Sequence, residues 1–183
     1  MTEVKSTVVV SALRALRARG LYDPYVAELS PELRARLLPL TAGSWIPVEL
    51  MIQHYAAVGR LKLGPGTIEE IGGEVGDRIN KSVLSVALTL SKKAGVTPWA
   101  ALSTSHRMTD ISWRGGDIAV YKLGPKDALY EWIAQPCAQV PYFVTSFRGL
   151  LRALATPFCT KAYTEVDPGR CSPTSVAYRL SWV

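Results

Sequence analysis

The sequence has few of the residues that most enzymes use for chemistry. It contains three cysteines and two histidines among 183 residues. It has no glycine-rich phosphate loop, no GxSxG nucleophile elbow and no HExxH zinc motif, which excludes the simplest nucleotide-binding, serine-hydrolase and zinc-protease assignments. The aspartates and glutamates are dispersed, and no pair has a spacing that requires acid–base catalysis. This shortage of catalytic groups predicts a protein that is not an enzyme.

A long apolar run is also missing. A membrane-spanning helix needs about eighteen or more consecutive apolar residues, and the sequence has no such run. Residues 1–5 lack the basic start and the cleavage site of a secretory signal. An odd number of cysteines fits free thiols in a reducing compartment better than a disulfide framework. We therefore predict a cytoplasmic protein without membrane insertion.

The net charge of +6 is a weak indication of an anionic partner. Many of the arginines fall in two short amphipathic segments, residues 14–19 and 34–36. Solvated helix faces explain this pattern better than a nucleic-acid footprint does. The chain has no aromatic-rich RNA motif, no helix-turn-helix pattern and no basic tail, so we predict no nucleic-acid partner.

Residues 1–116 predict a mostly helical half. Apolar residues recur there at helical spacing, and proline, glycine, serine and threonine mark the helix ends. Gly72 and Gly76 lie four residues apart on the longest of these helices. Their spacing indicates close helix packing or, as an alternative, close approach of a ligand. The predicted helices span residues 4–19, 30–38, 44–58, 68–94 and 97–111.

Residues 117–183 predict a sheet half. The hydrophobic period changes to two in four short stretches, and one helix between them has a continuous apolar face. The strands are predicted at residues 118–123, 128–134, 158–166 and 176–182, and the helix at 140–155. We therefore predict a single α+β domain of residues 1–183. Its N-terminal helical bundle packs on a C-terminal four-stranded antiparallel sheet with the chain order β-β-α-β-β.

Aromatic residues gather where the two halves are expected to meet. A cavity at that place would be apolar with a few hydroxyl and indole donors, which suits a flat or hydrophobic small molecule. The alternative is that these residues only fill the core. The candidate ligand-binding residues are Trp99, His106, Trp113, Tyr121, Tyr130, Trp132, Tyr142 and Phe147.

Histidine and cysteine leave two further possibilities. His54 and His106 both fall on predicted helices, where hydrogen-bonded or exposed residues are the ordinary interpretation and a haem axial ligand is the alternative. Cys137, Cys159 and Cys171 flank the last helix and the strands after it. They could converge on zinc, with Glu165 or Asp167 as a fourth ligand, or remain separate thiols. We predict no cofactor, with this zinc site as the lesser alternative.

Four stretches carry a resemblance to known proteins. They are "GGEVGDRINKSV" from Gly72, "GGDIAVYKL" from Gly115, "YFVTSFRGLLRAL" from Tyr142 and "DPGRCSPTSVAYRLSW" from Asp167. Together they resemble the 4-vinyl-reductase domain and its fold group, which includes haem-NO-binding domains and Bet3-type subunits of the TRAPP tethering complex. Within that group, residues 46–183 resemble most a myxobacterial paralogous family of unknown function.

The resemblance implies a helical bundle on an antiparallel sheet, often dimeric, with a pocket between the layers. In related phenol-responsive regulators, the pocket receives an aromatic effector, and cysteines around the C-terminal helix hold zinc. Cys137, Cys159 and Cys171 lie near the matching positions, although the full ligand set is not reproduced. The haem-binding relatives use a proximal histidine with a Tyr-x-Ser-x-Arg signature, which "YRLSW" does not match.

Two hypotheses from different classes follow. The first is a sensor-like domain that binds a small apolar or aromatic molecule between helices and sheet and signals to a separate partner protein. The second is a dimeric adaptor of the TRAPP type without a ligand, which would show a filled interior and an exposed apolar patch. An enzyme acting on a tetrapyrrole is a third reading, which the shortage of catalytic groups disfavours.

Overall fold

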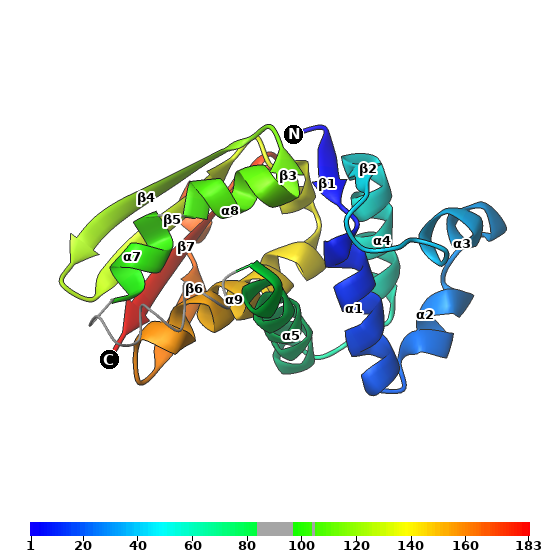
Figure 1. Cartoon of the computed structure of the whole chain (residues 1–183), viewed down its shortest axis with the longest axis horizontal. Coiled ribbons are helices and arrows are strands. Elements are labelled where there is room, and N and C mark those ends of the chain that lie inside the picture. Colours follow the sequence, from blue (N-terminus) through cyan, green and yellow to red (C-terminus); the bar gives the residue numbers. More distant parts are fainter. Residues whose placement is uncertain (84–96, 104) are drawn as a thin grey trace.

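Figure 1 shows a computed structural model of the chain, which describes residues 1–83, 97–103 and 105–183. The helices are α1 (Thr7–Ala18), α2 (Tyr22–Ala27), α3 (Pro31–Leu37), α4 (Val48–Arg60), α5 (Pro65–Val83), α7 (Pro98–Ser103), α8 (Ser105–Ser112) and α9 (Pro141–Ala155). The strands are β1 (Glu3–Lys5), β2 (Trp45–Pro47), β3 (Trp113–Arg114), β4 (Asp117–Gly124), β5 (Asp127–Ile133), β6 (Ala162–Val166) and β7 (Ser175–Trp182). Short 3₁₀ turns span Pro136–Gln139, Thr156–Phe158 and Pro168–Arg170.

The main sheet has four antiparallel strands in the order β4-β5-β7-β6. The period-two pattern sets its register, because Tyr130 pairs with Val120 on one side and with Tyr178 on the other. This row therefore points to one face, over which α7, α8 and α9 lie in Figure 1. The predicted α+β class and the four-stranded antiparallel sheet are confirmed.

A second, three-stranded sheet of order β2-β1-β3 was not predicted. Val4 pairs with Ile46 and with Trp113, so it lies in a strand, whereas the sequence placed it at the start of a helix. The helix predicted from residue 44 likewise begins only at Val48. Strands of two or three residues are too short to show an alternating hydrophobic pattern, so the sequence does not distinguish them from the end of a helix.

The buried apolar residues of the helical half belong to one core cluster that continues into the sheet half. Val9, Leu13 and Leu16 of α1 are buried as their spacing predicts, and α1 gives way to Gly20, which has a positive φ of 68°. Ser30 caps α3 by accepting a hydrogen bond from the backbone N–H of Leu33. The longest predicted helix, 68–94, corresponds to α5, but its residues from 84 onward lie outside the described residues.

The closest helix crossing joins α5 and α9. A Cβ added to Gly72 would overlap the carbonyl oxygen of Ser146 on α9. A Cβ added to Gly149 of α9 would overlap the carbonyl oxygen of Glu69 on α5 in the same way. Each helix therefore contributes one glycine at which the backbone of the other helix approaches closely. The predicted close helix packing at Gly72 is confirmed.

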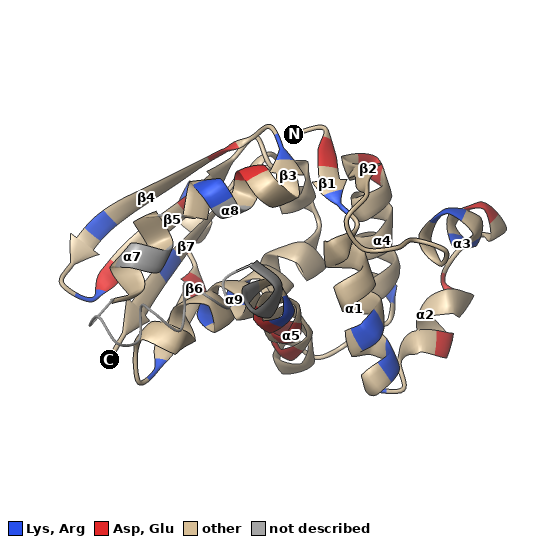
Figure 2. Cartoon of the chain, in the orientation of Figure 1, with Lys and Arg blue, Asp and Glu red and all other residues tan. Residues whose placement is uncertain are grey.

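Charge is spread over the molecule. Figure 2 shows Lys and Arg on elements of both halves, with Asp and Glu between them. Glu69 of α5 accepts from both Arg148 and Arg152 of α9, at 3.0 and 3.1 Å, and this ties the two crossing helices together on their polar side. Among the described residues, no helix combines the length and the apolar character needed to cross a membrane.

Candidate functional site

A small cavity lies between α8 and the main sheet. Its volume is about 60 Å³. One side is formed by Ser105, Thr109 and Ser112 of α8, which follow one another at spacings of four and three and so share one helix face. Apolar side chains complete the lining. The cavity is thus apolar with hydroxyl groups on one side.

The opposite side of the cavity is an aromatic cluster. Trp132 of β5 packs edge-on against Trp113, with ring centres 5.1 Å apart and an interplanar angle of 85°. The Phe147 ring of α9 lies 5.0 Å from Trp132, and it also contacts Tyr130 and Tyr178 of the sheet. These contacts fix the cavity wall, because aromatic pairs at such distances stabilise beyond the area that they bury.

Trp132 carries a buried hydrogen-bond donor at this wall. Its side chain is 1% exposed, and its indole Nε1 has no hydrogen-bond partner among the described residues. A buried donor without a partner costs about 1–3 kcal/mol, and most buried donors in folded proteins are paired. The Trp132 side chain thus combines a place in the cavity wall with an indole N–H that is enclosed behind that wall.

Tyr130 and Thr109 add a polar contact on the same cavity. Burial raises the pKa of the Tyr130 phenol well above its usual value, and a hydrogen bond with the Thr109 side chain opposes part of that rise. The Thr109 hydroxyl also donates to the backbone carbonyl of Ser105 at 3.0 Å. Tyr130 is therefore a neutral hydroxyl at physiological pH and serves as a hydrogen-bonding group without carrying charge.

The eight sequence-predicted ligand residues separate into two groups. Trp113, Tyr130, Trp132 and Phe147 line the cavity together. The other four do not line it: Trp99, His106, Tyr121 and Tyr142.

Each of these four has another environment. The Trp99 indole donates to the carbonyl of Pro125 at 3.0 Å, and its ring packs on Trp182. His106 is exposed on α8. Tyr121 is 47% exposed on β4. Tyr142 is buried at the start of α9 and lines a different pocket, between α9 and α4.

Sequence reasoning missed the hydroxyl side of the cavity. Ser105, Thr109 and Ser112 are polar residues of a short helix, and such residues normally face solvent. The available signal was their spacing of four and three, which gives the helix a single face of small hydroxyl residues. Tyr55 of α4 also lines the cavity, and nothing in the local pattern connects it to the sheet.

The zinc prediction is not supported. Burial raises the pKa of the Cys137 thiol to about 12, which disfavours the thiolate that binds zinc. The thiol of Cys159 donates to the carbonyl of Ala155, and that of Cys171 to the carbonyl of Asp167. Within residues 1–83, 97–103 and 105–183, no three or more His, Cys, Asp or Glu residues form a group that could hold a metal ion.

His54 is a core residue of the helical half. It is fully buried, and its Nδ1 forms a hydrogen bond of 2.8 Å with the Tyr25 hydroxyl. Burial lowers the pKa of His54 to about 3, so the imidazole is neutral at physiological pH. Its Nε2 has no partner in the part of the chain that the structure describes, and His54 lines neither of the two pockets described above.

No family model and no curated protein matches the chain. Solved structures do match its fold, and they are H-NOX proteins. The Fe(II) unliganded H-NOX protein from K. algicida superposes with a TM-score of 0.71 at 11% identity, over 98% of this chain and 96% of that one. The H-NOX protein from S. oneidensis in the Fe(II)NO state gives 0.62 at 11% identity, over 97% and 98%.

A third H-NOX structure, from work on the function of haem distortion, gives a TM-score of 0.60 at 17% identity, over 97% of this chain and 94% of that one. The chain thus has the H-NOX fold, and the predicted relation to the haem-NO-binding fold group is confirmed at the level of fold. The 4-vinyl-reductase, TRAPP and myxobacterial relationships stay predictions.

The same comparison corrects the prediction of no cofactor. Some of the structures that share this fold are described as haem proteins, so a cofactor-free protein does not follow from the fold. The described residues nevertheless fit a haem poorly. The cavity of about 60 Å³ is smaller than the roughly 150 Å³ of a protein cavity that binds benzene, and a porphyrin is several times larger than benzene. His106, the histidine of the covering helix, is exposed and does not line the cavity.

Proposed function

We propose that this protein is a sensor-like domain that binds a small, mainly apolar molecule with one acceptor atom between α8 and the main sheet. The observation that carries the proposal is the cavity itself, whose wall includes Trp132, and the buried indole N–H of that residue has no partner within the described residues. The hydroxyls of Thr109 and Tyr130 would fix the orientation of the ligand. Burial of apolar surface would supply most of the affinity.

The size of the cavity links binding to movement. A dry protein cavity that binds benzene has a volume of about 150 Å³, more than twice the volume found here. An aromatic ligand would therefore have to move α8 away from the sheet, whereas a molecule of a few heavy atoms would fit as the cavity stands. Displacement of α8 is the change that a separate partner protein would detect.

Native mass spectrometry of the freshly purified protein, beside its denatured mass and its absorption spectrum, tests this function. We expect a retained organic molecule or, for an empty protein, a rise in melting temperature with acetone, phenol or acetophenone. Ser112→Val places two methyl groups at the cavity and should abolish the rise. The matched control, Ser181→Val, changes the outer face of β7 and should keep it.

Three results would contradict the proposal. One is a protein that retains no molecule and shows no thermal shift with any of the three compounds. Another is an equal shift in Ser112→Val and in Ser181→Val. A haem absorption band would also overturn it, because the haem would occupy the space assigned here to a smaller ligand.

The dimeric adaptor remains a second candidate. Large apolar side chains are exposed on β4, β5 and β6: Tyr121 and Leu123 at 47%, Ile133 at 43% and Tyr163 at 44%. Tyr121 and Tyr163 lie on opposite edge strands, and the charged Arg179 of β7 lies between those strands. Sedimentation analysis decides this candidate, since a dimer that is lost in Tyr121→Ser and Leu123→Ser would favour it.

A further inference from the structure

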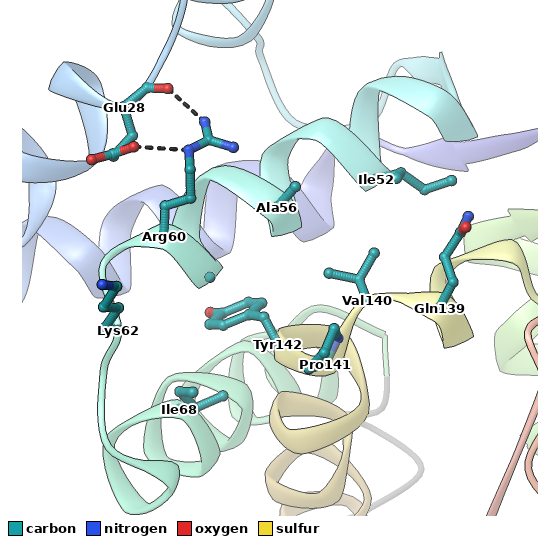
Figure 3. Close-up of a pocket in the computed structure, with 11 residues that line it drawn as sticks. Glu28, Ile52, Ala56, Arg60, Lys62, Ile68, Gln139, Val140, Pro141 and Tyr142 are labelled. Atoms are coloured by element: carbon teal, nitrogen blue, oxygen red, sulfur yellow. Dashed lines mark hydrogen bonds and ion pairs between the residues drawn. The ribbon is translucent and has the colours of Figure 1, made fainter.

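A second pocket lies on the other side of α9 from the sheet. It is an open groove of about 940 Å³ between α4 and the start of α9, on the helical half (Figure 3). Pockets that bind small molecules usually have about 300–1,000 Å³, so the groove has the size of a ligand site. Its apolar lining consists of Ile52, Ala56, Ile68, Val140 and Pro141.

Tyr142 gives the groove a polar group. Its side chain is 4% exposed, and the charge of Arg19 partly opposes the rise in the pKa of its phenol that burial causes. Figure 3 shows the hydroxyl end of Tyr142 directed toward the side of the groove where Arg60 and Lys62 lie. A phenol hydroxyl can both donate and accept, so it can form a hydrogen bond with a molecule in the groove.

The start of α9 contributes positive potential. Val140 is the N-cap residue and makes no side-chain cap, Pro141 follows it, and the first turn contains no acidic residue. No acidic side chain of the first turn therefore neutralises the positive end of the helix dipole where α9 borders the groove. A helix start alone does not define a site, but here it adjoins Tyr142, which also lines the groove.

Arg60 and Lys62 form the cationic end of the groove, which Glu28 also lines. Arg60 donates to the carboxylate of Glu28 at 2.8 Å and to its backbone carbonyl at 2.6 Å, so its charge is already used. Lys62 lines the same end, and no described residue forms an ion pair with it. Lys62 also has a positive φ of 52°, where glycine is the usual residue after a helix. A lysine held there at a cost in backbone strain is consistent with a use for its charge.

We infer that the groove binds an aliphatic carboxylate. Its carboxylate would accept from the Tyr142 hydroxyl and pair with Lys62, and its chain would follow α4 over Ala56 toward Ile52. Ile52 and Arg60 are eight residues apart on α4, which corresponds to roughly 12 Å at about 1.5 Å per residue, and this suits a chain of medium length. The site is separate from the cavity under α8, and neither proposal depends on the other.

Calorimetric titration of the full chain with decanoate tests the inference, with 1-decanol as the uncharged analogue. We expect saturable binding of decanoate that is at least about tenfold tighter than that of 1-decanol, because one charge-assisted hydrogen bond contributes at least that factor. Tyr142→Phe and Lys62→Gln should each weaken decanoate binding by about tenfold. The matched controls, Tyr163→Phe and Lys126→Gln, change exposed residues outside the groove and should bind decanoate as the unaltered chain does.

Circular dichroism establishes whether each variant is folded. If Lys62→Gln does not fold, the decanoate affinity of Tyr142→Phe alone tests the inference. The inference is overturned by an absence of saturable decanoate binding, by equal affinity for decanoate and 1-decanol, or by unchanged affinity in Tyr142→Phe. Binding only to vesicles that contain phosphatidylglycerol, with none to free decanoate, would also overturn it and would assign the groove to a membrane surface.

Discussion

The α5–α9 crossing and the α8–sheet contact use small residues to opposite effect. At the crossing, Gly72 and Gly149 each face a backbone carbonyl of the other helix, and no space remains between them. Under α8, Ser105, Thr109 and Ser112 face large aromatic rings, and a cavity of about 60 Å³ remains. Small residues close a contact when both partners have them at matched positions, and they leave a void when only one partner does.

The largest effect is expected at the crossing. Gly72→Ala adds a methyl group where the Ser146 carbonyl already lies, and a backbone atom cannot move aside as a flexible side chain can. We expect a loss of about 3 kcal/mol or more in the free energy of unfolding, the upper range for overpacking. Chemical denaturation followed by circular dichroism measures it.

Gly73→Ala is the matched control. It lies on the same helix, and an added Cβ would meet its nearest atom at an ordinary 3.7 Å. Since glycine within a helix is less stable than alanine by about 0.5–1 kcal/mol, Gly73→Ala should stabilise the protein slightly. Equal losses in both variants would refute the reciprocal glycine contact.

Acid should weaken the helical core before it affects the α8–sheet contact. The pKa of His54 is lowered to about 3 by burial, against about 6.5 in the unfolded chain. The contribution of His54 is therefore complete above pH 6.5 and is lost as the pH falls from 6.5 toward 3. At pH 5 the loss is about 2 kcal/mol, because only the unfolded chain binds the proton there.

The measurement is the free energy of unfolding from pH 7.5 to pH 5 in three proteins. His54→Gln should have a smaller pH dependence than the unaltered chain, whatever its stability at neutral pH. His106→Gln replaces the exposed histidine and should keep the original dependence. A pH dependence that His54→Gln leaves unchanged would show that His54 is not the responsible group.

A smaller effect is expected at the cavity. Thr109→Val keeps the shape of the side chain but removes the hydroxyl that interacts with Tyr130. We expect a loss of about 1 kcal/mol, the usual contribution of one buried hydrogen bond. Thr160→Val, at an exposed position, should change the free energy of unfolding little. If Thr109→Val were more stable than the unaltered chain, the contact between Thr109 and Tyr130 would not stabilise the polar side of the cavity.

The sequence predicted the elements that are long enough for their hydrophobic pattern to repeat several times. The main sheet and α9 each repeat their pattern several times, and their positions and class agree with the structure. The strand predicted at 158–166 begins later, at Ala162, because Pro157 and its neighbours form a 3₁₀ turn. The strands β1, β2 and β3 are too short to show a period.

The candidate site could be predicted only in part. Trp113, Tyr130, Trp132 and Phe147 lie in or beside periodic elements, so their common face follows from the pattern. Whether their indole and phenol groups have partners depends on contacts distant in sequence, and no local pattern contains that information. For this reason the unpaired Trp132 donor and the groove at Tyr142 were found only in three dimensions.

The pairing of β1 with β3 has a consequence for the order of folding. Glu3 lies opposite Arg114, 111 residues later in the chain. At a synthesis rate of about 5–20 residues per second, roughly 5–20 seconds separate the emergence of these two strands from the ribosome. β3 directly follows α8, so this distant pair helps to fix the covering helix of the cavity. A nascent chain can thus form the contacts between α1 and α5 well before the wall of the cavity under α8 is in place.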